Sequence, residues 1–153
     1  MSCAKTLAFA FVLCTLLAIP LTGAARQRAA CTISGTAGDD RLLGTNGPDV
    51  ICGKGGRDRI YGERGDDILT LYSGRASDRL AAGPGRDFLA ALSPRGAGVR
   101  DVLIGGTGAD NCLWSVDGSP GDTLRGGPGR DVFGADSGDR VHMVEIRHRC
   151  FTP

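Results

Sequence analysis

Four consecutive blocks of nine fill residues 35–70, and this short period constrains the fold more than any other feature of the sequence. The blocks read GTAGDDRLL, GTNGPDVIC, GKGGRDRIY and GERGDDILT. Each has glycine at its first and fourth positions, aspartate at its sixth and an aliphatic residue at its eighth. Glycine permits a left-handed backbone and close approach of neighbouring chains, so each block is predicted to form a tight loop followed by a very short strand. The glycines at these positions are Gly35, Gly38, Gly44, Gly47, Gly53, Gly56, Gly62 and Gly65.

Aspartates continue the period beyond residue 70, but they do so in pairs. Within each pair the two aspartates are nine residues apart, whereas successive pairs are separated by 9, 11, 14 and 12 residues. The pairs are Asp40 and Asp49, Asp58 and Asp67, Asp78 and Asp87, Asp101 and Asp110, and Asp122 and Asp131. The repeating unit is therefore two nonapeptides, which predicts a solenoid coil with two loops and two strands. The loops that end at the second aspartate are predicted to stay at six residues, while the other edge carries insertions, a common mark of a binding face.

The residue two positions after each aspartate is predicted to point into the interior. These residues are Leu42, Ile51, Ile60, Leu69, Leu80, Leu89, Leu103, Cys112, Leu124 and Phe133. Such a core is narrow, because each large buried side chain contributes only about 1.5–3 kcal/mol while ordering each residue of the chain costs free energy. Metal in the loops and disulfides at the ends are therefore expected to add stability.

Residues 1–25 have the pattern of a secretory signal peptide, with an apolar run at 6–19 followed by small residues. The run is shorter than the roughly 20 residues that span a bilayer, so a cleaved signal is favoured over a membrane anchor. The protein is thus predicted to be secreted, without a membrane span in its mature form. Cleavage would remove only Lys5 from the 18 basic residues and none of the 17 acidic ones, leaving a formal charge near zero. That balance argues against a nucleic-acid partner.

Four cysteines remain after residue 25, and an even number in a small exported domain predicts two disulfides. Three pairings are possible, and four free thiols are the alternative. We favour Cys31–Cys52 and Cys112–Cys150, because each of these bonds would close one end of the stack.

The blocks resemble the glycine-rich nonapeptide GGxGxDxUx of the hemolysin-type calcium-binding repeat, also called RTX, over most of residues 35–134. The resemblance implies an all-β fold, a right-handed parallel β-roll or β-solenoid of about five coils of two nonapeptides each. Residues 26–34 would form an N-terminal cap and residues 135–153 a C-terminal capping segment. The resemblance also implies Ca²⁺ between consecutive loops of one edge, held by the sixth-position aspartate and by carbonyl oxygens of the glycine loops. Calcium accepts six to eight such oxygen ligands in flexible geometry.

Transferred to this chain, the resemblance implies metal sites along both edges. On the regular edge the ligands would be Asp49, Asp67, Asp87, Asp110 and Asp131. On the other edge only Asp40 and Asp58 lie in two intact loops, and weak or no binding is expected at Asp78, Asp101 and Asp122. Arginine at the fifth loop position would compete with the metal if its guanidinium paired with the aspartate. These residues are Arg57, Arg86 and Arg130.

The sequence favours a binding protein over an enzyme. We find no nucleophile–base set, phosphate-binding glycine loop or zinc-protease motif, and the repeats fill nearly the whole mature chain. The favoured function is a secreted β-roll stabilised by calcium. The alternative is an extracellular adhesion, surface-binding or carbohydrate-binding module that uses the expanded loop edge, with an unknown glycan or surface as partner. A minimal polysaccharide-acting enzyme is a weaker third possibility, because paired carboxylates outside the ligand positions are missing.

Overall fold

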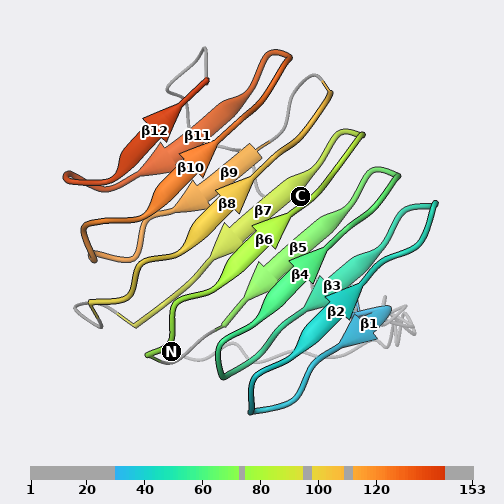
Figure 1. Cartoon of the computed structure of the whole chain (residues 1–153), viewed down its shortest axis with the longest axis horizontal. Coiled ribbons are helices and arrows are strands. Elements are labelled where there is room, and N and C mark those ends of the chain that lie inside the picture. Colours follow the sequence, from blue (N-terminus) through green and yellow to red (C-terminus); the bar gives the residue numbers. More distant parts are fainter. Residues whose placement is uncertain (1–29, 73–74, 95–97, 109–111, 144–153) are drawn as a thin grey trace, which may run out of the picture.

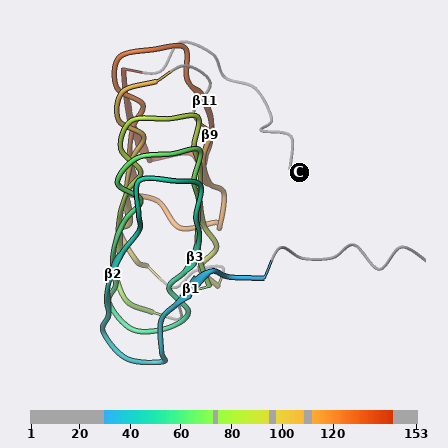
Figure 2. The ribbon, with the colours of Figure 1, turned by 90° about the vertical axis from the view of Figure 1, so that its right-hand side faces the viewer.

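The computed structural model describes residues 30–72, 75–94, 98–108 and 112–143. These residues form twelve short strands in two six-stranded parallel sheets, with no helix among them. The chain alternates between the sheets, so each coil adds one strand to each (Figure 1). Seen from the side, the sheets are two facing walls joined by loops at both edges (Figure 2). The predicted all-β parallel β-roll of about five turns is confirmed.

The odd-numbered strands form one sheet and the even-numbered strands form the other. The first sheet contains β1 (Ile33–Ser34), β3 (Val50–Cys52), β5 (Ile68–Leu71), β7 (Phe88–Ala91), β9 (Cys112–Ser115) and β11 (Val132–Ala135). The second contains β2 (Arg41–Leu43), β4 (Arg59–Tyr61), β6 (Arg79–Ala81), β8 (Val102–Ile104), β10 (Thr123–Arg125) and β12 (Arg140–His142). Strand β1 lies in the predicted N-terminal cap and β12 in the predicted C-terminal capping segment. Both continue the sheets rather than only covering their ends.

The core is two files of aliphatic side chains, one from each sheet, that meet between the walls. Ile51, Leu69 and Leu89 occupy equivalent positions on β3, β5 and β7 and are fully buried. The file of the other sheet is Ile60, Leu80, Leu103 and Leu124, also fully buried. Nearly all of the predicted inward positions are thus confirmed.

The prediction that Cys112 points inward is wrong, because Leu113 takes that position. Leu113 pairs with Leu89 and is fully buried, whereas Cys112 pairs with Phe88 and is only half-buried. Asp110 stands two residues before this strand, whereas the other regular-edge aspartates stand one residue before theirs. The regular edge therefore has one loop that is longer by a residue, which counting from aspartate to aspartate could not reveal.

The stacking of coils requires glycine at the fourth position of the second-coil loops. A Cβ on Gly56 would overlap the backbone of Gly38, and one on Gly65 would overlap that of Gly47. Gly38 and Gly47 stand at the same fourth position in the preceding coil. Gly56 and Gly65 also have φ of 95° and 127°, in the region that side chains disfavour. Successive loops of one edge therefore lie in direct backbone contact.

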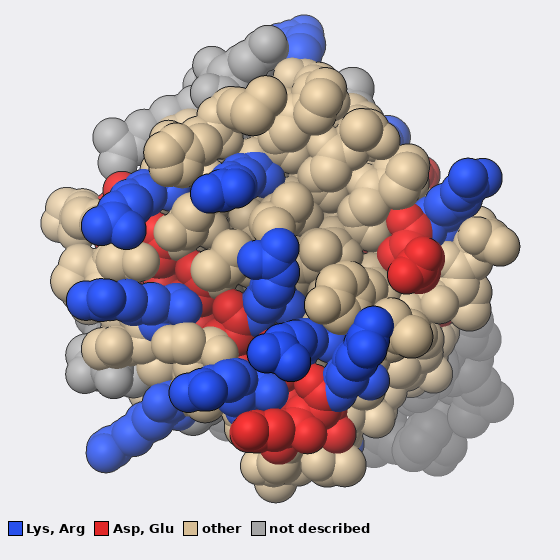
Figure 3. All heavy atoms as spheres, in the orientation of Figure 1, with Lys and Arg blue, Asp and Glu red and all other residues tan. Residues whose placement is uncertain are grey.

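The outer face of the even-numbered sheet is rich in arginine. Arg41, Arg59 and Arg79 lie in register on β2, β4 and β6, and all three are exposed. Figure 3 shows basic side chains gathered over this face. Because side chains alternate along a strand, these arginines point outward while the residues on either side of them in sequence point inward.

One of the two favoured disulfides is confirmed. Cys31 and Cys52 are bonded, with Cα atoms 5.9 Å apart, and the bond links the segment directly before β1 to β3. Cys112 is also disulfide-bonded. Its favoured partner Cys150 lies outside the described residues, as do the predicted signal peptide at 1–25 and Asp110. In the part of the chain that is described, no helix has the length and apolar character needed to cross a membrane.

Candidate metal centre

Six sixth-position aspartates turn inward at the end of their loops and accept a backbone N–H from the preceding coil. They are Asp58, Asp67, Asp78, Asp87, Asp101 and Asp122. The backbone N–H of Asp49 donates to Oδ1 of Asp67 at 2.9 Å, and that of Asp67 donates to Oδ1 of Asp87 at 3.0 Å. On the other edge the same bond runs from Asp40 to Asp58 at 3.0 Å and from Asp58 to Asp78 at 2.6 Å. One oxygen of each of these six carboxylates thus binds coil to coil.

The second oxygen of the carboxylate folds back over the first glycine of its own loop. A Cβ on Gly53 would lie 2.5 Å from Oδ2 of Asp58, and one on Gly35 would lie 2.8 Å from Oδ2 of Asp40. Real Cβ atoms essentially never approach so closely. The first glycine of the motif is therefore needed to make room for the carboxylate of the sixth residue.

The first two loops, residues 35–40 and 44–49, satisfy this second oxygen with threonine. We call them the threonine loops. Thr45 donates to Oδ2 of Asp49 from its backbone N–H at 2.6 Å and from its hydroxyl at 2.9 Å. Thr36 makes the same two bonds to Asp40, at 2.6 and 2.9 Å. The threonine hydroxyl also accepts the N–H of the fourth residue of the loop, so the loop is closed by its own groups.

The next two loops, residues 53–58 and 62–67, leave the second oxygen without a donor. We call them the open loops. Their second residues are Lys54 and Glu63, with φ of 77° and 75°, and not threonine. Oδ2 of Asp58 and Oδ2 of Asp67 are buried and have no hydrogen-bond partner. A buried carboxylate oxygen without a donor is costly, so this arrangement calls for a proton or a cation at that oxygen.

The pKa of Asp49, in a threonine loop, is shifted in the opposite direction to the pKa values of the open-loop aspartates. In the threonine loop, the backbone N–H of Thr45 is the main reason that the pKa of Asp49 is lowered. In the open loops, burial raises the pKa of Asp58 to about 6 and also raises the pKa of Asp67. Burial likewise raises the pKa of Asp87, in the following coil, to about 6. Near neutral pH the carboxylates of the open loops are ionised against an unfavourable environment.

The open loops offer the oxygen chemistry that calcium prefers. The carbonyl groups of Gly47 and Gly65 lie directly against the fourth glycine of the next coil on the regular edge. Backbone carbonyls and an unpaired carboxylate oxygen are hard ligands, and no thiol or imidazole stands at the loop positions. The donor set therefore fits a calcium ion.

The comparison with protein families agrees with this geometry. The family model of the RTX calcium-binding nonapeptide repeat matches residues 32–69, 70–91 and 118–141, more than half of the chain. The chain belongs to this RTX family. No curated protein and no solved structure matches it. The RTX match leaves out residues 92–117, which contain the longest loop of the expanded edge.

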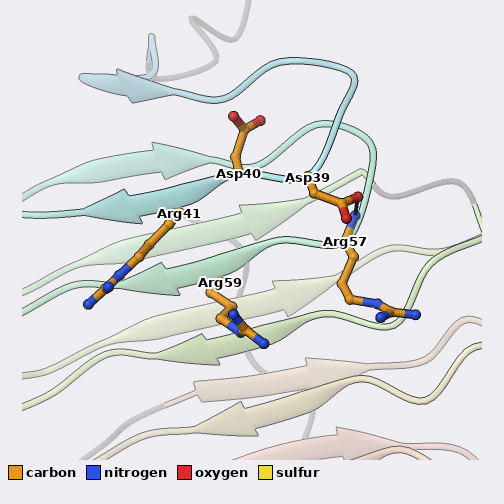
Figure 4. Close-up of a pocket in the computed structure, with 5 residues that line it drawn as sticks. All are labelled: Asp39, Asp40, Arg41, Arg57 and Arg59. Carbon is orange, nitrogen blue, oxygen red and sulfur yellow. Dashed lines mark hydrogen bonds between the residues drawn. The ribbon is translucent and has the colours of Figure 1, made fainter.

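In this RTX chain the arginine side chains beside the first loop point away from its aspartates. Figure 4 shows Arg41, Arg57 and Arg59 extending away from Asp39 and Asp40, around an open depression of about 290 Å³. Arg57 contacts Asp39 through its backbone N–H, which donates to Oδ1 at 2.7 Å. Arginine is not among the groups that shift the pKa of Asp58 or Asp87. The competition between these guanidinium groups and the metal that the sequence suggested stays a prediction.

The structure places the sequence-predicted ligands in three situations. Asp40 and Asp49 are in threonine loops, whereas Asp58 and Asp67 are in open loops. Asp87 and Asp131 are buried at the regular edge, in loops whose second residues, Gly83 and Gly127, have φ of 111° and 107°. Asp110 lies outside the described residues. The metal ligation of all seven remains a prediction.

Sequence reasoning missed one group of acidic residues. The carboxylates of Asp101, Asp117 and Asp122 come together at the expanded edge, with all three residues buried. Asp117 is not at a sixth position, so the nonapeptide frame gave it no role. The only signal was the segment DGSPGD at 117–122, which is acidic and turn-forming outside the frame.

Proposed function

We propose that this protein is a secreted RTX β-roll in which Ca²⁺ binds at the open loops and stabilises the fold. The observation that carries the proposal is the pair of buried carboxylate oxygens, Oδ2 of Asp58 and Oδ2 of Asp67, that have no hydrogen-bond donor. A cation beside them would replace the missing donors and offset the cost of burying the charge.

The residues that would hold calcium are the aspartates of the open loops and the carbonyl groups stacked beside them. On the regular edge the proposed ligands are Asp67 of the open loop and Asp87 of the loop in the following coil, with the carbonyls of Gly47 and Gly65. On the other edge Asp58 is the principal ligand. Because the loops take this form only when the coils stack, binding free energy would become folding free energy.

A structural role fits the chemistry better than a catalytic one. Asp58, Asp67 and Asp87 each use one oxygen to accept a backbone N–H from the preceding coil. A carboxylate fixed in that way is poorly placed to exchange protons with a substrate. Export is supported by the signal-like residues 1–25 and by the Cys31–Cys52 disulfide, which is typical of an oxidising compartment.

The test is a calorimetric calcium titration of the purified protein, followed by circular dichroism and thermal unfolding with calcium or with a chelator. Calcium should give a heat of binding and raise the midpoint of unfolding. Asp67→Asn should remove binding at its loop. Asp66→Asn is the matched control, because Asp66 is the exposed neighbour that accepts the backbone N–H of Arg86. No heat of binding and no calcium-dependent gain in stability would refute the proposal.

A further inference from the structure

The loop between β9 and β10, residues 116–122, differs from every six-residue loop of the repeat. It begins with Val116 and Asp117 and ends at Asp122, the aspartate that accepts the backbone N–H of Asp101 in the preceding coil. Asp101 ends the loop between β7 and β8, in the coil directly before it. The two loops therefore lie side by side at the expanded edge, where the nonapeptide pattern predicts weak or no metal binding.

Three carboxylates converge between these loops. One oxygen from each of Asp101, Asp117 and Asp122 lies within 4.8 Å of the other two. The exposed fractions of the three residues are 0 %, 4 % and 0 %. Three buried negative charges at such separations repel strongly, because water does not screen them.

Asp117 and a neighbouring hydroxyl leave donor or acceptor capacity unused in this buried space. Oδ1 of Asp117 accepts the backbone N–H of Ser119 at 2.7 Å, but Oδ2 has no partner. The hydroxyl of Ser119, in the same turn, is fully buried and also has no partner. One oxygen of Asp117 also lies within 4.8 Å of an oxygen of Asp101 and of Asp122, so this residue with an unpartnered oxygen is part of the cluster.

The other two carboxylates are held in place by the fold. Asp101 accepts the backbone N–H of Asp78 at 2.9 Å and the hydroxyl of Ser93 at 3.3 Å. Asp122 accepts the backbone N–H of Asp101 at 2.8 Å and the hydroxyl of Ser115. Their positions are therefore fixed before any ligand arrives, as a preorganised site requires.

Carboxylates raise one another's pKa in this group. Burial, with the charges of Asp122 and Asp78 adding to it, raises the pKa of Asp101 to about 7. Burial also raises the pKa of Asp122, and the charges of Asp139 and Asp117 add to the effect. Negative charges gathered in a buried space favour a cation among them.

We propose that Asp101, Asp117 and Asp122, with the Ser119 hydroxyl, bind one calcium ion at the expanded edge. All of these ligands are hard oxygens, which favours calcium over zinc or copper. The site differs from the repeat sites because Asp117 is not at a sixth position and both loops are expanded. It does not depend on calcium binding by the open loops, and either can exist without the other.

Terbium luminescence tests this site in the full protein, with Tb³⁺ as the calcium substitute. The chain contains a single tryptophan, Trp114 on β9, three residues before Asp117. Excitation at the red edge of tryptophan absorption should therefore sensitise Tb³⁺ in this loop, and added Ca²⁺ should displace the signal.

The decisive variant is Asp117→Asn, which keeps an oxygen for the Ser119 N–H but removes the charge. We expect tryptophan-sensitised emission to fall about tenfold or more, which corresponds to ~1.4 kcal/mol of binding. Asp67→Asn, at an open loop, should leave that emission unchanged. Unchanged emission in Asp117→Asn would overturn the proposal.

Two further measurements guard against a folding defect. In chelator, Asp117→Asn should unfold at a higher temperature than the parent, because one buried charge is gone. In calcium, its thermal gain should be smaller than that of the parent. Ser119→Ala removes only the hydroxyl and should weaken Tb³⁺ binding several-fold without loss of fold. An equal calcium-dependent gain in Asp117→Asn and the parent would show that protonation, and not a metal, balances the three carboxylates.

Discussion

The first coil and the coil after it stabilise the same nine-residue motif in different ways. In the first coil, Thr36 and Thr45 donate to the second oxygen of the loop aspartates, and the Cys31–Cys52 disulfide encloses both loops. In the next coil, Lys54 and Glu63 take left-handed conformations and the second oxygens have no donor. β-branched threonine disfavours that conformation, which accounts for the difference in backbone.

This difference shows how one motif serves two purposes. A threonine loop is complete with groups of the protein alone, and in the loop of Thr45 the aspartate, Asp49, has a lowered pKa. An open loop is complete only when a proton or a cation is added, and its aspartate has a raised pKa. The loops that fit calcium best are therefore those with glycine or another residue that accepts a positive φ at the second position.

The largest expected effect on stability comes from replacing the glycine at the fourth position of a second-coil loop, while the same change in the first coil should cost little. Gly56→Ala would place a Cβ against the Gly38 backbone and impose strain at a φ of 95°, so we expect a loss of about 4 kcal/mol in the free energy of unfolding. Gly38→Ala should cost only about 0.5 kcal/mol, because the nearest atom to its Cβ would be Oγ1 of Thr36 at 3.8 Å. Urea unfolding measures both. Equal costs would show that coil stacking does not set this glycine.

Loss of the disulfide should affect the first coil without affecting the open loops. Its cysteines are 21 residues apart, and removal of such a bond by Cys31→Ala with Cys52→Ala should cost about 3 kcal/mol. The cost should be the same in calcium and in chelator. A change in calcium affinity would contradict the separation of the two regions.

The pH dependence of stability in chelator should also separate the loop classes. Burial raises the pKa of Asp58 from 3.8 to about 6 in the folded protein, so folded protein binds more protons between these values. Its contribution is fully present below the unfolded pKa and is lost as pH rises through about 6. Asp87 has the same sign, whereas Asp49, with a lowered pKa, has the opposite sign.

We therefore expect the folding equilibrium constant in chelator to fall about tenfold or more from pH 4.5 to pH 7.5. Asp58→Asn should reduce this slope, whereas Asp49→Asn should leave it nearly unchanged, because the lowered pKa of Asp49 affects stability only near and below its unfolded value of 3.8. With calcium the trend should reverse, because the metal needs ionised carboxylates. Stability that rises with pH in chelator would contradict the raised pKa values of the open loops.

Removal of one threonine hydroxyl should leave the second oxygen of the loop aspartate with one donor fewer. Thr45→Val loses the hydroxyl bonds to Asp49 and to the N–H of Gly47, and should cost about 1 kcal/mol with or without calcium. The pKa of Asp49 should rise, as measured by NMR titration of its carboxyl carbon. A stability change that depends on calcium would show that the threonine loops also bind metal.

The smallest expected effect concerns the second residue of an open loop. Glu63→Gly relieves a non-glycine residue at a φ of 75° and should stabilise the protein by about 1 kcal/mol. Thr45→Gly should destabilise it, because the loop there needs the threonine donors. If both substitutions had the same sign, the two loop classes would not differ in backbone strain.

The order of coils, the inward file and one disulfide could be predicted because they depend on spacing. Glycine and aspartate recur at fixed intervals, and a parallel stack converts equal intervals into register. The exception was Cys112, where the chain has one extra residue between aspartate and strand. Aspartate spacing does not record that residue, and only the pairing of Leu113 with Leu89 identifies it.

The sequence by itself determined that this chain stacks nine-residue repeats whose loops end in aspartate, because glycine recurs where the loops touch and where the carboxylate folds back. The tertiary structure decided which of those aspartates lack a partner. That depends on the backbone conformation of the second loop residue and, at the expanded edge, on hydroxyl donors in or directly before the aspartate's own loop, such as Ser93 and Ser115. It also decided that Asp117 meets Asp101 and Asp122, since contacts between expanded loops follow from stacking and not from the repeat.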